Sequence, residues 1–327
     1  MNHNLSSLEL RTISLLDTAL SISELSEKTG VTRGYISRTV ASLKDKGFVE
    51  ISKRGITKKV ALSSSLHAAR LKSLIRSRSY MSLEELLQVS SMQILAVLAC
   101  GSADFERLRE ESGVSKATLW RWIKKYKEHA MLLSRDDEYE LPQDLKDIRE
   151  FLEDYCSYFA VSTLKEISQA GSFIAAKGFE FLFSLKEEIV HENVRPTGLT
   201  SISEEIPLML AENYYFYSSR TISIEEIAVH AVAADPRSKR NLSYVIMYIL
   251  KAKLDAALFL KIAKRYRVED IARSVLKLLN TWEQPEEPYM PDPAYVREKL
   301  KEYNIQWQEQ NSMKNTYLPS LKKSEMF

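Results

Sequence analysis

Two short runs of the sequence place arginine, lysine and hydroxyl side chains at spacings suited to hydrogen bonding with a polyanion. Arginine and lysine can donate to base edges and to phosphate oxygens, and serine and threonine hydroxyls can donate to phosphate. The candidate contact residues are Thr32, Arg33, Gly34, Tyr35, Ser37, Arg38 and Lys44 in the first run, and Lys53, Arg54, Lys58 and Lys59 in the second. This chemistry requires an exposed helix for the first run and a hairpin for the second.

The residues around these runs predict those elements. A short helix over 22–29 is expected to begin near a capping serine, Ser23, and to end at Gly30. A second helix over 32–46 carries an apolar face at helical spacing. Residues 48–52 and 57–62 then read as two strands around a basic tip. With a first helix over 7–17, the pattern predicts a winged helix-turn-helix, with helix 32–46 in the major groove and the 53–59 wing on the DNA backbone.

A second segment repeats this pattern in weaker form. A short helix over 103–112 precedes Gly113, and a Gly-Val-Ser-Lys start parallels the earlier Gly-Val-Thr-Arg. The residues expected to contact DNA here are Ser115, Lys116, Thr118, Arg121 and Lys124. The second wing, over 132–141, carries the carboxylates of Asp136, Asp137, Glu138 and Glu140, which would repel phosphate. We therefore expect this copy to read DNA less strongly. Of Trp120 and Trp122, which point to different faces, at least one is expected in the core.

Positive charge is concentrated at the start of the chain. The 327 residues carry a net charge of only +2, but residues 1–80 hold 14 Lys/Arg against 6 Asp/Glu. Residues 81–147 hold 9 against 13, and residues 148–327 hold 23 against 25. The excess of cations therefore lies on the segment predicted to meet DNA.

Catalytic and metal chemistry find little support in the sequence. Gly101-Ser102 begins like a nucleotidyltransferase motif, but no two carboxylates follow at two-residue spacing on a strand. His230 follows Glu226 by four residues, a spacing that can hold a metal, although a hydrogen-bonded packing histidine is the favoured interpretation. Cys100 and Cys156 are isolated and read as buried, reduced thiols. We expect no enzyme activity, no cofactor and no metal.

The rest of the chain predicts an α+β region. Residues 142–160 read as an aromatic-rich helix, and residues 173–176, 179–186 and 214–217 read as strands. The aromatic run 214–217 is interpreted as sheet core, with a small-ligand pocket as the alternative. Helices are expected near 223–234, 238–252, 255–266, 268–282 and 294–303. The expected domains are 1–80, with a connecting helix over 64–80; 81–160; 161–284; and 285–327, a Pro-rich connector with a terminal helix and a frayed tail.

Several motifs resemble known families. Residues 22–62 resemble the MarR/ArsR-type winged helix, and the wider arrangement resembles archaeal winged-helix regulators. The motifs that carry the wider similarity are residues 113–121, 222–231, 240–245 and 266–271. The segment Ser-Ile-Glu-Glu-Ile-Ala-Val-His-Ala also resembles the C-terminal domain of AbiEi-type antitoxins. The resemblance implies a transcription regulator, with a toxin as one possible partner.

The sequence therefore predicts a mainly α protein with tandem winged helix-turn-helix units followed by an α+β C-terminal domain. We expect a sequence-specific regulator of double-stranded DNA that forms a homodimer through helix 64–80 or helix 142–160. The alternative is an antitoxin or complex subunit whose winged helices and C-terminal domain bind protein. Without an apolar run of membrane-spanning length or a signal peptide, a cytoplasmic protein without membrane contact is expected.

Overall fold

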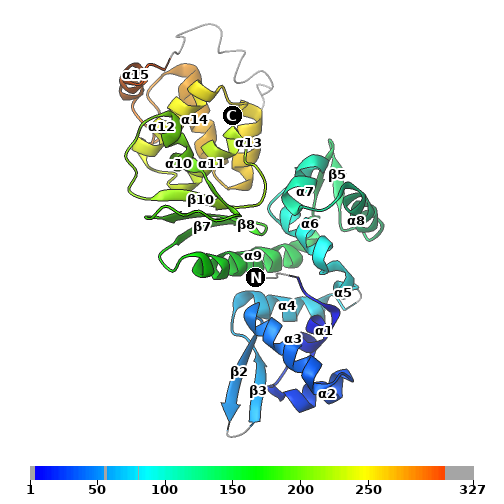
Figure 1. The fold of residues 1–327 in the computed structure, drawn as a ribbon. Coiled ribbons are helices and arrows are strands. Elements are labelled where there is room, and N and C mark those ends of the chain that lie inside the picture. Colours follow the sequence, from blue (N-terminus) through cyan, green and yellow to red (C-terminus); the bar gives the residue numbers. More distant parts are fainter. Residues whose placement is uncertain (1–3, 55–56, 80, 306–327) are drawn as a thin grey trace. The chain divides into compact units, whose positions relative to one another are not determined.

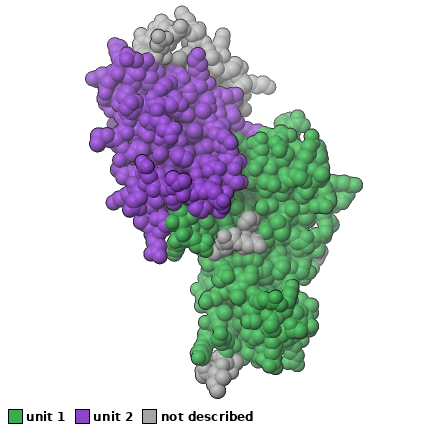
Figure 2. Space-filling view, in the orientation of Figure 1, with its two compact units in different colours: residues 1–167, 176–179 green, residues 168–175, 180–327 purple. Residues whose placement is uncertain are grey.

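The computed structural model describes residues 4–54, 57–79 and 81–305. Its contacts divide the chain into two compact units (Figure 2). Unit 1 holds residues 1–167 and 176–179, and unit 2 holds residues 168–175 and 180–327. The expected four-domain division stays a prediction, and the expected tail over 306–327 lies outside the described residues. No helix in the described ranges has an apolar stretch long enough to cross a membrane.

Unit 1 begins with a winged helix whose three helices pack beside a small sheet (Figure 1). Its elements are α1 (Ser7–Leu15), β1 (Leu20–Ser21), α2 (Ile22–Thr29), α3 (Arg33–Asp45), β2 (Val49–Arg54) and β3 (Thr57–Leu62). The strands are antiparallel in the order β1-β3-β2. The helix expected over 22–29 is confirmed at both ends, and α3 is one residue shorter at each end than predicted.

Local signals explain where these helices begin and end. The apolar face of α3 is buried through Ile36, Val40 and Leu43, as the periodicity predicts. The predicted cap of α2 at Ser23 is wrong, because Ser21 accepts the hydrogen bond of the Glu24 amide and the Glu24 carboxylate accepts that of Ser21. Of these two serines, only Ser21 is followed three residues later by a Glu or Gln, as a capping box requires.

A buried ion pair fastens the C-terminal end of α3 to the start of α1. Lys46 Nζ lies 2.6 Å from Glu9 Oε1, and the two side chains are 6% and 5% exposed. The same carboxylate accepts hydrogen bonds from the Ser42 hydroxyl at 2.8 Å and, through Oε2, from the Ser6 amide at 2.6 Å. On the opposite side, His67 Nε2 lies 3.2 Å from the Lys46 carbonyl oxygen. These contacts fix how α3 is turned about its own axis.

Two helices expected to form a dimer interface pack against each other within unit 1. These are α4 (Leu66–Ser77) and α9 (Lys146–Ile167). Arg70 of α4 pairs with Glu150 and Asp154 of α9. The faces of α4 and α9 that make these contacts are therefore already used inside one chain, and a second copy would have to use other faces.

A second set of elements follows the first at a constant offset of 83 residues. Ala103–Asp104 (β4) corresponds to β1, Phe105–Ser112 (α7) to α2, and Lys116–Glu128 (α8) to α3, each with the same length as its counterpart. The preceding helix is α6 (Val89–Ala99), and the hairpin that follows is β5 (Leu133–Arg135) and β6 (Glu138–Glu140). The strand order β4-β6-β5 equals the order β1-β3-β2 of the first set. Short elements α5 (Leu83–Leu86) and η1 (Gln143–Leu145) connect this set to its neighbours.

Unit 2 combines a four-stranded sheet with helices, which agrees with the α+β class expected for the C-terminal region. The strand order is β7 (Ser172–Lys177), β8 (Glu180–Leu185), β10 (Asn213–Tyr217) and β9 (Val194–Pro196). In β8, Phe181, Phe183 and Leu185 are buried, and Leu182 and Ser184 between them are buried as well. A central strand can be covered on both faces. The helices are α10 (Gly198–Glu205), α11 (Ile224–Ala234), α12 (Lys239–Ala252), α13 (Ala256–Arg265), α14 (Glu269–Thr281) and α15 (Pro293–Glu302).

The aromatic residues of β10 belong to the core of unit 2. Tyr215 and Phe216 are buried, and Tyr215 stacks on Phe183 across the sheet with ring centroids 5.6 Å apart. The interpretation of residues 214–217 as sheet core is thereby confirmed for these two positions. The sequence did not indicate β9 or α10. The first residue of α10, Gly198, has φ +54°, and a Cβ added there would lie 3.3 Å from the Ala231 amide nitrogen.

His230 of α11 is a fully buried packing residue with both ring nitrogens in hydrogen bonds. Nδ1 lies 2.7 Å from the Thr197 hydroxyl, and Nε2 lies 2.6 Å from the Tyr266 hydroxyl. Burial lowers the pKa of His230 to about 4, although the nearby Glu226 carboxylate raises it. The imidazole is therefore neutral at pH 7, as a hydrogen-bonded packing histidine should be.

The Lys46–Glu9 pair predicts a large loss of stability when one partner is removed. Glu9→Gln leaves the Lys46 ammonium buried without its carboxylate, which should cost about 3 kcal/mol in the free energy of unfolding. Denaturant unfolding of the Glu9→Gln variant and of the wild type measures this difference in unfolding free energy. The double variant Glu9→Gln, Lys46→Met should recover most of the loss, because it removes the uncompensated charge. A single Glu9→Gln variant as stable as the wild type would show that the pair does not hold α3.

The neutral state of His230 predicts acid sensitivity in unit 2. Its pKa is about 4 when folded against 6.5 when unfolded, so its stabilising contribution is complete above pH 6.5 and is lost as the pH falls toward 4. The loss should reach about 3 kcal/mol. We expect His230→Gln to flatten the fall of unfolding free energy between pH 6.5 and pH 4. The exposed His191→Gln is the matched control, and an equal flattening there would contradict the assignment.

Candidate nucleic-acid interface

The outward face of α3 carries the predicted contact residues. Gly34, Ser37, Arg38 and Ala41 are exposed on the side opposite the buried stripe, and Arg33 and Lys44 are exposed beside them. Arg33, Arg38 and Lys44 have no carboxylate within ion-pair distance in the described part of the chain. The structure therefore groups these residues on one solvent-facing surface, with their charges available.

The N-terminal end of α3 has no side-chain cap, unlike those of α1, α2 and α7 but like that of α4. Ser6, Ser21 and Asp104 each accept a backbone hydrogen bond at the start of α1, α2 and α7, whereas Thr32 makes no side-chain cap hydrogen bond at the start of α3. The first backbone N–H groups of α3 can therefore donate to another acceptor, which the positive end of the helix dipole would also attract. A phosphate at such a helix start is a common partner.

Tyr35 and Arg38 form a pair on the flank of α3. The Arg38 guanidinium lies 5.3 Å from the centroid of the Tyr35 ring, which is 51% exposed. A cation over a ring face gains a modest attraction and restricts the arginine without neutralising it. Arg38 is therefore held at the border between the outward face and this flank.

The wing places two lysines directly opposite each other. Lys53 of β2 and Lys58 of β3 are register partners, and both side chains are exposed. Like charges at directly opposed positions destabilise an antiparallel pair. A phosphate bound between them would relieve that repulsion. The side chain of Arg54, the next predicted contact, lies outside the described residues.

Lys59 is placed differently from the other two wing lysines. Its ammonium lies 2.8 Å from Glu24 Oε2 at the start of α2. That hydrogen bond, together with those of the Ser21 capping box, lowers the pKa of Glu24 to about 2. Lys59 therefore connects the wing to α2 and has less charge to offer than Lys53 and Lys58. Lys46, at the far end of α3, is buried against Glu9 and does not belong to this surface.

The other cations near the start of the chain are largely neutralised. In α4, Lys72 and Arg76 both pair with Asp17, and Arg78 pairs with Asp147. With Arg70, Lys46 and Lys59, at least six of the 14 cations in residues 1–80 have carboxylate partners in the described part of the chain. The charge that remains available lies mainly on α3 and the wing tip.

The predicted contacts of the second set lie on α8. Lys116, Arg121 and Lys124 are exposed, whereas the Ser115 hydroxyl caps α8 by accepting from the Thr118 amide at 3.3 Å. Lys124 lies 4.0 Å from Glu128. Ser115 and Thr118 are therefore occupied with each other, and the cations supply what this helix can offer to DNA.

The two tryptophans of α8 have separate environments. Trp122 is buried and Trp120 is 51% exposed, as the sequence predicted for residues on different faces. Trp120 packs on Phe105 of α7 with ring centroids 4.6 Å apart. In the offset of 83 residues, Trp120 takes the position of Ser37. An aromatic residue thus stands on α8 where α3 has a small hydroxyl.

The second hairpin has the opposite charge from the first. Asp136 and Asp137 form its tip with φ of 48° and 63°, and Arg135 is the register partner of Glu138. Both aspartates are exposed. This tip would repel a phosphate backbone, which agrees with the weaker DNA contact predicted for this copy.

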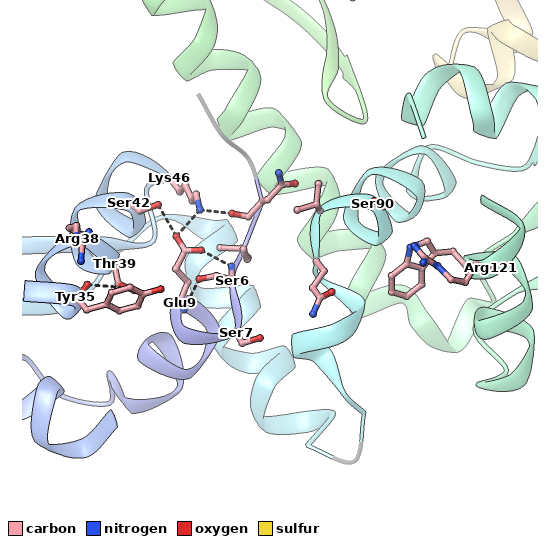
Figure 3. Close-up of a pocket in the computed structure, with 15 residues that line it drawn as sticks. Ser6, Ser7, Glu9, Tyr35, Arg38, Thr39, Ser42, Lys46, Ser90 and Arg121 are labelled. Atoms are coloured by element: carbon pink, nitrogen blue, oxygen red, sulfur yellow. Dashed lines mark hydrogen bonds and ion pairs between the residues drawn. The ribbon is translucent and has the colours of Figure 1, made fainter. Parts of the chain in front are cut away.

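Sequence reasoning missed a cleft on the flank of α3. It has a volume of about 690 Å³ and is lined by residues of α3, of α8 and of the first residues of the chain (Figure 3). Figure 3 shows Arg38 and Tyr35 on one side and Arg121 on the other, with Ser6 and Ser7 between them. No signal in the sequence joins these segments, because the lining comes from four separate stretches of the chain, within 4–9, 35–46, 88–90 and 121–122.

The comparison with known proteins agrees with the first set of elements. Residues 3–55 match the model of the MarR family. A comparison with curated proteins gives no match. The matched range contains α1 to α3 and β2, so it includes the outward face of α3 but not the second set or unit 2. A winged-helix domain of this family suggests a DNA-binding transcription regulator.

Proposed function

We propose that the protein is a sequence-specific regulator of transcription that inserts α3 into the major groove of double-stranded DNA. The observation that carries this proposal is the segregation of charge in unit 1. Arg33, Arg38, Lys53 and Lys58 lie on one helix face and one hairpin tip without ion-pair partners in the described chain, while six other cations are paired internally. In this arrangement Arg33, Ser37 and Arg38 read base edges, and Lys53 and Lys58 hold the backbone.

The second set of elements is proposed to be a second winged helix-turn-helix. The support is the constant offset of 83 residues, the equal lengths of the paired elements and the matching strand order. Its cations on α8 would attract a phosphate backbone and its acidic hairpin would repel it, so this copy contributes less to DNA affinity. The protein is proposed to act as a homodimer on a site with two related halves, as two-fold symmetric regulators do.

A specific observation favours a second candidate for part of the molecule. The exposed Trp120, stacked on Phe105 beside an acidic hairpin tip, resembles a protein-binding surface more than a DNA-binding one. In that alternative, the second set or unit 2 binds a protein partner, as an antitoxin or a complex subunit would. Negligible DNA affinity of the full chain at low salt would favour this alternative.

Paired substitutions test the proposed roles of α3 and the wing. A binding site is first selected from sheared genomic DNA, and affinities are then measured by fluorescence anisotropy at several salt concentrations. Arg33→Ala should cost about 1–3 kcal/mol at the selected site and much less on unrelated DNA, because it reads a base. Lys58→Ala should weaken all sequences similarly and reduce the salt slope by about 1.

The outcomes of this experiment separate the roles clearly. Equal, sequence-blind losses from both variants would remove Arg33 as a base reader. Lys59→Ala is the matched control on the wing. Because Lys59 is already paired with Glu24, this substitution should reduce the salt slope less than Lys58→Ala does.

Gly34 provides a test in which stability and binding move in opposite directions. The glycine lies in α3 without a positive φ, and an added Cβ would meet nothing within 4 Å, so the fold does not require it. Gly34→Ala should raise the unfolding free energy by about 0.5–1 kcal/mol. Affinity for the selected site should fall about tenfold, equal to 1.4 kcal/mol, if the backbone approaches DNA there. Thermal unfolding and anisotropy measure both, and unchanged affinity would remove close approach at Gly34.

A further inference from the structure

The outward side of α8 has an aromatic centre where α3 has a small hydroxyl. Trp120 is 51% exposed and packs on Phe105 of α7 with ring centroids 4.6 Å apart. Ala117, one turn before Trp120 on the same side of α8, is exposed as well. Tryptophan is enriched among the few residues that supply most of the binding energy of protein interfaces. An exposed tryptophan held in place by a second ring therefore indicates a surface that another molecule covers.

The charges around this aromatic centre are separated by sign. Lys116 and Lys124 are exposed one turn before and one turn after Trp120, on the same side of α8. Asp136 and Asp137 are exposed at the tip of the β5–β6 hairpin, and neither has a cation within ion-pair distance in the described chain. The helix thus offers positive charge to a partner, and the tip offers negative charge.

The two aromatic rings lie between the two groups of charge. Phe105 directly follows Asp104, which is the register partner of Glu138 in β6, and residues 136–137 at the tip directly precede Glu138. Trp120 reaches Phe105 from α8, the helix that carries the lysines. Figure 1 shows the hairpin beside α7 and α8. The surface therefore extends from cations on α8, across the two rings, to carboxylates at the tip.

We call this surface the α8–hairpin face, and it consists of Phe105, Lys116, Trp120, Lys124, Asp136 and Asp137. Its order of charges is self-complementary. After a two-fold rotation about an axis through the aromatic rings, the lysines of a second copy meet the carboxylates of the first, and its carboxylates meet the lysines. The tryptophans then meet at the centre, where the residues that dominate an interface usually cluster.

Other occupants fit this charge pattern less well. Duplex DNA would be attracted by the lysines and repelled by the aspartates at the tip. A protein partner carrying charge of one sign would meet the same conflict at one end or the other, and like charges brought together across an interface are costly. A second copy satisfies both ends at once. It also uses no residue of α3 or of the first wing, where DNA contact is proposed.

We propose that the α8–hairpin face binds a second copy of this chain about a two-fold axis. The Trp120 side chains lie at the centre, and Lys116 and Lys124 of each copy lie against Asp136 and Asp137 of the other. The association itself needs no DNA. Its use, which is to hold two α3 helices for the two halves of one DNA site, rests on the proposed function.

A charge-swap experiment on the full chain tests the interface by analytical ultracentrifugation at low ionic strength. We expect the wild type to be a dimer at micromolar concentration, and Trp120→Ser to weaken the dimer at least tenfold. The double variants Lys116→Glu, Lys124→Glu and Asp136→Lys, Asp137→Lys should each be monomeric, because every charged contact across the axis becomes repulsive. An equimolar mixture of these two double variants should form dimers again, because each contact then joins opposite charges.

The matched control lies in unit 2. The double variant Glu187→Lys, Glu188→Lys reverses two adjacent exposed carboxylates outside the α8–hairpin face and should leave the dimer unchanged. Thermal unfolding checks that each variant is folded. Anisotropy on the selected DNA measures whether any variant changes DNA binding.

The possible results distinguish this interface from other uses of the surface. A wild-type monomer, a dimer indifferent to Trp120→Ser, or a mixture of the two reversed variants that stays monomeric would overturn the proposal. Reversal of the two lysines that lowers DNA affinity but leaves the dimer intact would assign the face to DNA and also overturn it. A wild-type dimer that forms through this face and binds no DNA would overturn the proposed function and leave the interface standing.

Discussion

The buried pair of Lys46 and Glu9 determines what α3 can present to solvent. Helix α3 has one side in the core, one side facing outward and one side lining the cleft. Because successive side chains are 100° apart around a helix, its rotation about its own axis decides which residues lie on each side. Apolar packing alone tolerates small rotations, whereas an ion pair with hydrogen bonds from Ser42 and Ser6 specifies direction. Burying both charges is costly. The same contacts therefore position Gly34 and Ser37 outward and Tyr35 toward the cleft.

The internal ion pairs change the meaning of the charge excess in the sequence. The count for residues 1–80 suggests a broadly cationic segment, but Lys72 and Arg76 share Asp17, and Lys59 belongs to Glu24. These pairs join α4 and the wing to the helices beside them. The charge that remains available lies mainly on α3 and the wing. Charge confined to one helix and one hairpin can follow one groove and its flanking backbone, which a diffuse cationic surface cannot do selectively.

The sequence predicted the parts of this structure that depend on local signals. The apolar spacing of Ile36, Val40 and Leu43 and the glycine at position 30 were sufficient to place α2 and α3 within a residue. The sequence did not predict which lysines lack an ion-pair partner. Lys46 and Lys58 look alike in sequence, but Lys46 pairs with Glu9, which lies 37 residues away along the chain. Two-residue strands such as β1 and β4 are too short for periodicity to register. The cleft depends on side chains that only the packing of unit 1 brings together.

The two similar sets of elements differ at the hairpin and at the start of the third helix. At the wing, Lys53 opposes Lys58, whereas the second hairpin sets Arg135 against Glu138. The first pairing is unfavourable for the isolated protein and the second is favourable. At the helix start, Thr32 leaves the amides of α3 uncapped while Ser115 caps α8. In both places the first set gives up stability that the second keeps. An anionic partner that neutralises the wing and accepts hydrogen bonds from the start of α3 would account for both.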